Sequence, residues 1–199
     1  MKRQQILDAA YTIFSRKGYH RATVDEIIAL ADTGKGTVYK YFVNKEQLFY
    51  TLIKERSAPF ETELTLIASV AEPPLKKIEK AVKVFLEFYV SNADLWRVLM
   101  HEMRGLGHEE SSNFTEAQRK KYRERFARTI AVLQSIIQEG IERKDIRPCD
   151  TNKAAHGLFS VIVMMVFQGF VSDKEDAIKK MAAGITDIFL YGVAEHKKK

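Results

Sequence analysis

Helical periodicity runs through almost the whole chain of 199 residues, and no segment shows the two-residue alternation typical of a half-buried strand. Near the N-terminus, Ile6, Ala10, Ile13 and Phe14 recur at the three- to four-residue spacing that places them on one face of a helix. Apolar residues make up 46% of the sequence, which is enough to fill a core. The pattern predicts an all-α protein.

Capping and breaking residues divide this periodic pattern into separate helices. A first helix over residues 2–17 should end at Gly18, because glycine most easily adopts a left-handed cap. The capping box "TVDE" starts a second helix at Thr23, and "GKGTVYKYF" forms a short third helix. Asn44 caps a long fourth helix, which Pro59 is expected to kink or divide.

The rest of the chain predicts longer and more apolar helices. Pro73 or Pro74 occupies the first turn of the next helix, a position that proline tolerates. Further helices are expected over residues 93–104, 115–143, 150–171 and 172–196, with a loop over residues 105–113.

Positive charge is concentrated in the first quarter of the sequence. The chain has a net charge of +6, and residues 1–50, with eight basic and five acidic side chains, carry half of that excess. A basic region of this kind favours a polyanionic partner.

The stretch "TGKGTVYKYF", residues 33–42, combines glycines, lysines and hydroxyl groups, as phosphate-binding segments do. A nucleotide P-loop is excluded, because Ala29 stands where its first glycine is required and Gly36 where its final hydroxyl is required. The dinucleotide pattern is also excluded, because Tyr39 replaces its third glycine. The phosphate of a nucleic-acid backbone is the remaining interpretation.

Three short helices, the last two joined by a tight turn, match a helix-turn-helix motif, whose second helix lies in the major groove of DNA. Gly36 removes a side chain where the start of that helix must approach the duplex closely. The side chains expected between the two helices are Val24, Ile27, Ala31, Val38 and Phe42, and those expected to face outward are Lys35, Thr37, Tyr39 and Lys40.

The segment "TVDEIIALADTGKGTVYKYFVNKEQLF", residues 23–49, resembles the signature of the TetR/AcrR family of bacterial transcriptional regulators. The resemblance implies an all-α homodimer with a DNA-binding domain over residues 1–48 and a ligand-binding and dimerisation domain over residues 49–199. It also implies a palindromic operator, and a repressor released from it by a small effector.

Carried over position by position, the resemblance assigns two kinds of DNA contact. The residues implied to approach base edges are Lys35, Gly36, Thr37 and Tyr39, and those implied to hold phosphates are Thr23, Thr33, Lys40, Tyr41 and Lys45. Two residues of the turn depart from the family pattern, since Asp32 and Thr33 replace the usual glycine and apolar residue. Aspartate tolerates the left-handed region better than most residues, so we expect the turn to form.

The last two predicted helices are apolar on more than one side. One stretch of 19 residues between Lys153 and Asp173 has no charge, which is near the minimum for a membrane span. A helix apolar on two sides needs two packing partners. We expect the second partner to be another copy of the chain, giving a homodimer through these helices.

Aromatic residues and methionines of the middle helices suit either an ordinary core or a pocket for a bulky apolar effector. The candidates are Phe85, Phe88, Tyr89, Trp96, Met100, Met103, Tyr122, Phe126, Met164 and Gln168. The helix over residues 123–148 is similar to that of family members that respond to fatty-acyl compounds, so the effector is expected to be of that kind.

Other classes of protein have less support. The pairs His101-Glu102 and His108-Glu109 lack the second histidine of a zinc helix, and no nucleophile motif is present. We therefore expect no catalytic residue, metal or cofactor. The single cysteine, Cys149, excludes an intramolecular disulfide, and with no apolar core of a signal peptide the expected location is the cytoplasm. A lipid-binding or membrane-surface protein without specific DNA binding is the alternative.

Overall fold

The computed structural model describes residues 1–104 and 114–193. The loop expected over residues 105–113 and the last residues of the final predicted helix lie outside the described part of the chain, as does the pair His108-Glu109.

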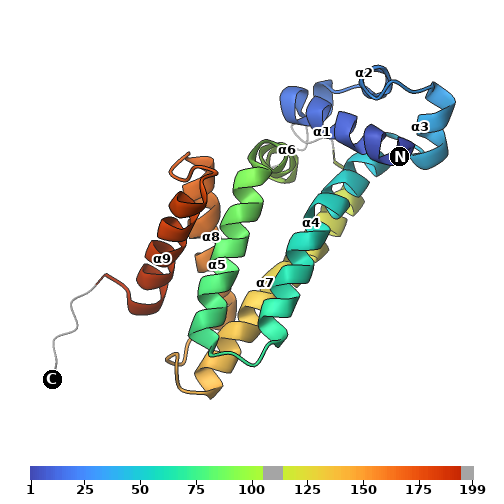
Figure 1. The fold of residues 1–199 in the computed structure, drawn as a ribbon. Coiled ribbons are helices and arrows are strands. Elements are labelled where there is room, and N and C mark those ends of the chain that lie inside the picture. Colours follow the sequence, from blue (N-terminus) through green and yellow to red (C-terminus); the bar gives the residue numbers. More distant parts are fainter. Residues whose placement is uncertain (105–113, 194–199) are drawn as a thin grey trace. The chain divides into compact units, whose positions relative to one another are not determined.

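Within the described residues the chain forms nine helices and no strand, which confirms the predicted fold class (Figure 1). The helices are α1 (Lys2–Arg21), α2 (Val24–Leu30), α3 (Lys35–Tyr41), α4 (Lys45–Ser69), α5 (Pro74–Ser91), α6 (Ala93–Arg104), α7 (Glu116–Glu142), α8 (Thr151–Phe167) and α9 (Glu175–Tyr191). None of these helices is long and apolar enough to cross a membrane.

The caps predicted at Thr23 and Asn44 form, whereas the left-handed cap predicted at Gly18 does not, since α1 extends to Arg21. Gly18 adopts φ 76° and ψ 172°, so the regular part of α1 ends there and a further turn follows to Arg21. The Thr23 hydroxyl accepts a hydrogen bond from the amide of Glu26, and the Glu26 carboxylate accepts one from the amide of Thr23. Asn44 likewise accepts a bond from the backbone at the start of α4, at 2.8 Å.

Of the two outcomes expected at Pro59, a kink or a division, the division does not occur, because α4 is a single helix of 25 residues. A proline inside a helix removes one backbone hydrogen bond, but packing can offset that loss. Phe60 and Leu64, which follow the proline, are both buried, so burial supports the helix beyond it. Pro74 stands at the first position of α5, as expected.

The chain packs as two compact units. Unit 1 comprises residues 1–59 and 92–120, and unit 2 comprises residues 60–91 and 121–199. In unit 1, α1 packs against α2, α3 and α6, whereas in unit 2 α5 packs against α8 and α9. Unit 1 therefore holds the predicted helix-turn-helix together with α6, while α4 and α7 each contribute residues to both units.

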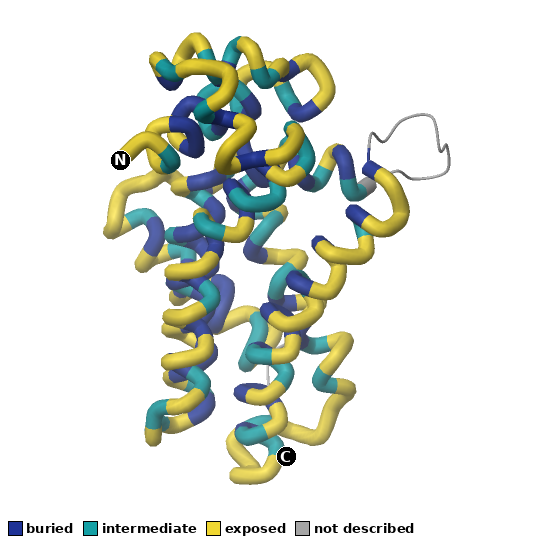
Figure 2. Tube along the Cα trace, turned by 90° about the vertical axis from the view of Figure 1, so that its right-hand side faces the viewer, coloured by how far each residue is buried: buried dark blue, intermediate teal, exposed yellow. Residues whose placement is uncertain are grey.

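Aromatic side chains form the centre of each unit. In unit 1 the ring of Phe49 lies 4.8 Å from that of Phe14 and 5.0 Å from that of Tyr19. In unit 2 the ring of Phe60 stacks on Phe88 at 4.2 Å and meets the edge of Phe85 at 4.9 Å. Figure 2 shows how buried and exposed residues alternate along the helices that surround these centres.

Candidate nucleic-acid interface

The turn between α2 and α3 forms despite its unusual residues. Asp32 adopts φ 45°, the left-handed conformation that the sequence predicts for it. The amide of Thr33 donates to the carbonyl of Ile28 at 3.3 Å, which closes the turn. From α1, the Lys2 ammonium donates to the carbonyl oxygen of Asp32 at 3.3 Å.

Apolar packing fixes α3 in place. Ile27 on α2 is fully buried, and Val38 and Phe42 are 1% and 2% exposed. Ala31 is also buried, while Val24 is half-buried. The side chains expected between the two helices thus lie on the inner side of the motif.

The opposite side of α3 faces solvent. Tyr39 is 43% exposed, Lys35 and Lys40 are exposed, and Thr37 is half-buried. A Cβ added at Gly36 would meet no atom within 4 Å. The glycine is therefore not needed for packing inside this chain, and it leaves room for another molecule to approach the backbone.

A single exposed ion pair holds Lys35 only weakly. The Lys35 ammonium lies 3.5 Å from the carboxylate of Asp25, and both side chains are more than two-thirds exposed. An exposed pair of this kind contributes little to stability. Lys35 can therefore exchange this partner for a nucleic acid at small cost.

Lys45 has a different environment from the other lysines of the motif. Its ammonium donates to the carbonyl oxygens of Tyr19, His20 and Ala22, at 2.9, 3.2 and 3.1 Å. An ammonium has three N–H groups, so these contacts use all of them. Burial lowers the pKa of Lys45. The side chain thus ties the start of α4 to the end of α1.

The other three predicted phosphate contacts have mixed exposure. Thr23 is exposed, and its hydroxyl, which accepts the capping bond, still has a proton to donate. Tyr41 is 40% exposed, and its ring lies 6.3 Å from that of Phe42. Thr33 is half-buried in the turn. All three lie in or beside the helix-turn-helix.

The ten candidate ligand residues do not form one cluster within either unit. Unit 1 contains Trp96, Met100 and Met103, and unit 2 contains Phe85, Phe88, Tyr89, Tyr122, Phe126, Met164 and Gln168. Of the second group, three aromatic residues from α5 and Tyr122 are buried and Phe126 is half-buried, whereas Met164 is 52% exposed and Gln168 is exposed. Burial raises the pKa of the Tyr89 hydroxyl above its ordinary value.

Two residues of the aromatic cluster in unit 2, Phe60 and Phe159, are not marked out by the sequence. Phe159 on α8 lies 4.8 Å from the ring of Phe126 and 5.9 Å from that of Tyr89, and Phe60 stacks on Phe88. Phe60 follows Pro59, which was expected to interrupt the helix, and Phe159 lies in the segment assigned to dimerisation. Both residues fit the helical spacing of apolar positions. The rings that they contact lie far away in the sequence, so the spacing alone does not predict these contacts.

Large apolar side chains remain exposed on α8, on α9 and on the segments that follow them. They are Val161, Met164, Phe170, Ile188, Tyr191 and Val193, with exposures from 40% to 89%. Such a group on one pair of helices is typical of a surface that packs against a partner.

These features define the class of the protein, a transcriptional regulator that binds DNA through a helix-turn-helix. The sequence matches the family model of bacterial regulatory proteins of the tetR family over residues 6–51, and that of the tetracyclin repressor-like C-terminal domain over residues 71–193. The chain belongs to the TetR family.

Relatives of similar length support this assignment. An uncharacterized HTH-type transcriptional regulator of Bacillus subtilis, YhgD, is 26% identical over 196 residues, covering 95% of this chain and 94% of its own. A provisional fatty acid metabolism regulator of Clostridium perfringens has a similar structure, with a TM-score of 0.82, 28% identity and coverage of 96% and 99% of the two chains.

A further solved structure is similar in fold. The transcriptional regulator FadR from Bacillus subtilis, in complex with stearoyl-CoA, has a TM-score of 0.80 and 23% identity, with coverage of 96% of this chain and 99% of the other.

Proposed function

We propose that this protein is a repressor that binds a palindromic operator as a homodimer and leaves it when a small apolar effector binds. The observation that carries the DNA-binding part is the outer side of α3, where Lys35, Gly36 and Tyr39 are exposed while Val38 and Phe42 anchor the helix from behind. Lysine donates to guanine edges in the major groove, and tyrosine adds contact area beside it.

The DNA-binding domain in this proposal extends over residues 1–48, and residues 49–199 serve ligand binding and dimerisation. Lys40, Thr23, Thr33 and Tyr41 are the proposed phosphate contacts. Lys45 can join them only by giving up carbonyl contacts at the end of α1. Its main contribution is therefore to orient the motif. Because its target is chromosomal DNA, the protein acts in the cytoplasm.

Dimerisation through α8 and α9 is supported by their exposed apolar residues. Met164 is 52% and Ile188 is 55% exposed in a single chain, and a two-fold partner would cover both. Met164 and Gln168, two of the candidate ligand residues, lie on this exposed part of α8 and its C-terminal cap. A two-fold dimer presents two copies of α3, which explains why the operator should be palindromic.

The effector is proposed to be a fatty-acyl compound that binds at the aromatic cluster of unit 2. Two findings support this class. The cluster around Phe60, Phe85 and Phe88 is apolar, and Phe126 at its edge is half-buried. Two structural neighbours are, in addition, a provisional fatty acid metabolism regulator and a protein solved with stearoyl-CoA.

Coupling between effector and DNA is proposed to run through α4. This helix begins beside the helix-turn-helix at Lys45 and ends in unit 2 at Ser69. A ligand that favours a different tilt of α4 would change the separation of the two α3 helices, so that both no longer fit their half-sites.

The DNA-binding proposal is tested by selecting bound fragments of genomic DNA at moderate salt. We expect a palindromic site, and a log affinity that falls with log salt by about 0.9 for each phosphate contact. If no palindrome is recovered and binding is insensitive to salt, the protein is better described as a lipid-binding protein without specific DNA binding.

The effector proposal is tested by titrating acyl-CoA compounds of increasing chain length against the protein, with and without operator DNA. Coupling must be reciprocal, so a ligand that weakens operator binding by about a hundredfold must itself bind about a hundredfold more weakly to the complex, equal to roughly 2.7 kcal/mol. Tight ligand binding that is the same in both conditions would refute the switch and leave the DNA-binding proposal intact.

A further inference from the structure

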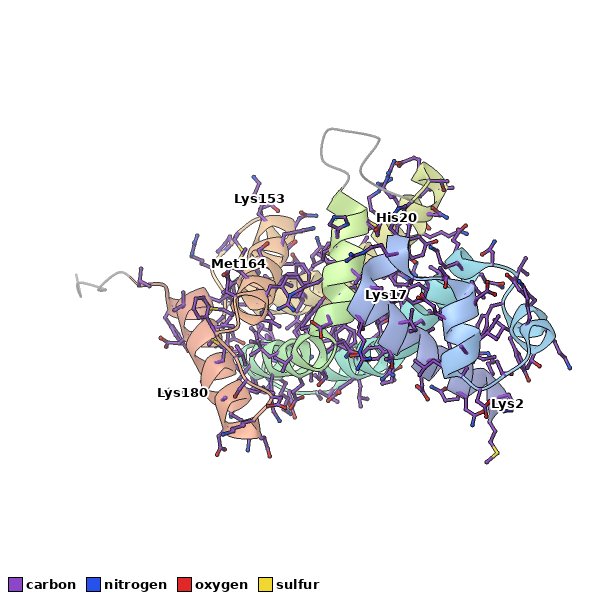
Figure 3. All side chains as sticks on the ribbon, turned by 90° about the horizontal axis from the view of Figure 1, so that it is seen from above. Lys2, Lys17, His20, Lys153, Met164 and Lys180 are labelled. Carbon is purple, nitrogen blue, oxygen red and sulfur yellow. The ribbon has the colours of Figure 1, made fainter. Side chains whose placement is uncertain are left out.

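Unit 1 carries a second basic site, formed by residues outside the proposed DNA contacts. A cavity of about 410 Å³ opens between α1 and α6, a volume within the usual range for small-molecule sites. Its basic lining is Arg16, Lys17, His20 and Arg21 from α1, with Arg97 and His101 from α6. Figure 3 shows Lys17 and His20 at the opposite end of α1 from Lys2.

Four basic residues of α1 lie on either side of a break in the helix. At about 100° per residue, positions 16, 17, 20 and 21 of a regular helix fall within about 140° of its circumference, on one side. Gly18, with φ 76° and ψ 172°, interrupts α1 between the pair Arg16 and Lys17 and the pair His20 and Arg21. Both pairs line the same cavity.

Two of the positive charges have no carboxylate partner among residues 1–104 and 114–193. Lys17 pairs with Glu26, and Arg97 pairs with Asp94 at 2.8 Å. Arg16 and Arg21 are exposed, and within the described residues neither forms an ion pair. The guanidinium of Arg21 donates only to the carbonyl of its neighbour Lys17, at 3.4 Å.

The other lining residues limit what can bind. Among the described residues of the lining, Glu102 is the only acidic one, and its side chain is 3% exposed. Val98 and the buried Tyr19 supply apolar surface. The cavity therefore offers two guanidinium groups that have no ion-pair partner in the described part of the chain, beside an apolar wall. Guanidinium groups bind carboxylate and phosphate oxygens in a bidentate manner. A phosphate group carries up to two negative charges, which suits two guanidinium groups better than the single charge of a carboxylate does.

We propose that this cavity binds a small phosphate-bearing molecule, held by Arg16 and Arg21. The phosphates of the DNA backbone are the competing ligand, because the proposed phosphate contact Thr23 follows Arg21 by two residues. The base-reading helix begins near the other end of α1, because Lys2 contacts the turn that precedes it, and a helix of this length extends about 24 Å from Lys2 to Gly18. This cavity is distinct from the proposed acyl site. A negative result for phosphate binding would therefore leave the proposal of an acyl effector unaffected.

The test uses isothermal titration of the full-length protein with two probes, inorganic pyrophosphate and ADP. We expect saturable binding of both to the unaltered protein. ADP binding tighter than pyrophosphate would mean that the apolar wall holds a nucleoside, and equal affinities would mean that phosphate groups suffice. Absence of saturable binding of either probe would overturn the proposal.

Substitutions then locate the binding. The double variant Arg16→Gln with Arg21→Gln should bind pyrophosphate at least tenfold more weakly. The matched control, Arg128→Gln with Arg147→Gln, also removes two exposed arginines but lies outside the cavity, and its affinity should change less than twofold. Equal losses in both variants would mean unspecific attraction by net charge. That result would overturn the site.

Two further measurements distinguish binding in the cavity from contact with the DNA backbone. In the unaltered protein, pyrophosphate should shift the imidazole NMR signals of His20 and His101, which line the cavity, and leave that of His156 on α8 unchanged. The opposite result has two parts: the Arg16→Gln and Arg21→Gln double variant binds random DNA with a weaker salt dependence, and pyrophosphate does not shift the histidine signals of the unaltered protein. The arginines would then contact the DNA backbone, and the proposal would be wrong.

Discussion

Both units of this molecule have an aromatic centre, but polar contacts contribute more to the helix-turn-helix than to unit 2. The helix-turn-helix of unit 1 adds to its apolar packing polar contacts to the backbone, such as the reciprocal bonds of Thr23 and Glu26 and the three bonds of Lys45. Unit 2 depends on aromatic rings that meet across helices, as Phe60 and Phe85 do at 4.9 Å.

The difference follows from the size and task of each part. Helices α2 and α3 have seven residues each, too short to bury much apolar surface, so their ends must be capped and their few buried side chains placed accurately. Polar contacts give that accuracy. The longer helices of unit 2 can bury large rings, which stabilise strongly but have little directional preference. Accurate geometry suits DNA recognition, while an apolar core suits an apolar effector.

The largest effect should come from removing a ring of unit 2. Phe85→Ala deletes a fully buried side chain that contacts the rings of Phe60, Tyr89 and Phe159. We expect a loss of about 3–5 kcal/mol in the free energy of unfolding, measured with urea at a fixed protein concentration. Leu66→Ala, which truncates a side chain that is 61% exposed, is the control and should cost far less. Similar costs would show that the cluster is not the stabilising centre of unit 2.

A smaller loss should follow the removal of one charged group in unit 1. Lys45→Met leaves the carbonyl oxygens of Tyr19, His20 and Ala22 without their donor. Hydrogen bonds from charged groups contribute about 1.5–3 kcal/mol, and we expect a decrease of that order in the free energy of unfolding.

Lys40→Met is the matched control for this change, because Lys40 is exposed and makes no ion pair among the described residues. It should leave stability almost unchanged and weaken operator and random DNA alike, as the loss of a phosphate contact does. If both variants weaken DNA binding equally without loss of stability, Lys45 is a phosphate contact as first predicted, and its carbonyl contacts matter little.

These two residues also show how far the sequence could predict the structure. The caps at Thr23 and Asn44 were predictable because each bonds to backbone three residues away. The contacts of Lys45 were not, because its partner carbonyls lie 23 to 26 residues earlier in the chain. The same holds for the ring of Phe159, which meets rings from α5 and α7. Local contacts leave a pattern in the sequence, and distant ones leave only apolar spacing.

Changing the outer side of α3 should affect recognition and leave stability almost unchanged. Tyr39 is 43% exposed, so Tyr39→Ala removes little packing. We expect a loss of about 1–3 kcal/mol in binding to the selected operator, and a much smaller loss on random DNA, because base contacts carry specificity. Tyr39→Phe, the control, separates the hydroxyl from the ring. Equal losses on operator and random DNA would make Tyr39 a backbone contact instead.

Removing the cap of α2 should cost less than removing a buried ring. Thr23→Ala deletes the hydroxyl that accepts from the amide of Glu26, and such changes cost about 0.5–2 kcal/mol. Thr23→Ser keeps the hydroxyl and should restore most of the stability in urea unfolding. A serine variant as unstable as the alanine variant would mean that the methyl group, not the cap, is what the position requires.

The smallest effect concerns a polar contact inside unit 2, where apolar contacts dominate. The Lys77 ammonium, 4% exposed, donates to the carboxylate of Glu139 at 2.7 Å, and this hydrogen bond lowers the pKa of Glu139 below its ordinary value of 4.5. A carboxylate whose pKa is lower in the folded state stabilises the fold above its unfolded pKa, and this contribution disappears as the pH falls through the lowered value. The stability difference between the unaltered protein and Glu139→Gln should therefore be present at pH 6 and should shrink below about pH 4.5.

Urea unfolding at a series of pH values measures that difference, and Glu79→Gln controls for the loss of one negative charge, because Glu79 is exposed and makes no ion pair in the described part of unit 2. If the stability difference between the unaltered protein and Glu139→Gln stays constant from pH 6 to pH 3, the charge of the carboxylate is not its cause. The amide would then fail to replace the carboxylate because of its shape. In that case the bond that Lys77 donates to the carbonyl oxygen of Ala68, at 2.9 Å, would hold this buried ammonium in place. Unit 2 would then depend on a lysine that bonds to backbone carbonyl oxygen, just as unit 1 does at Lys45.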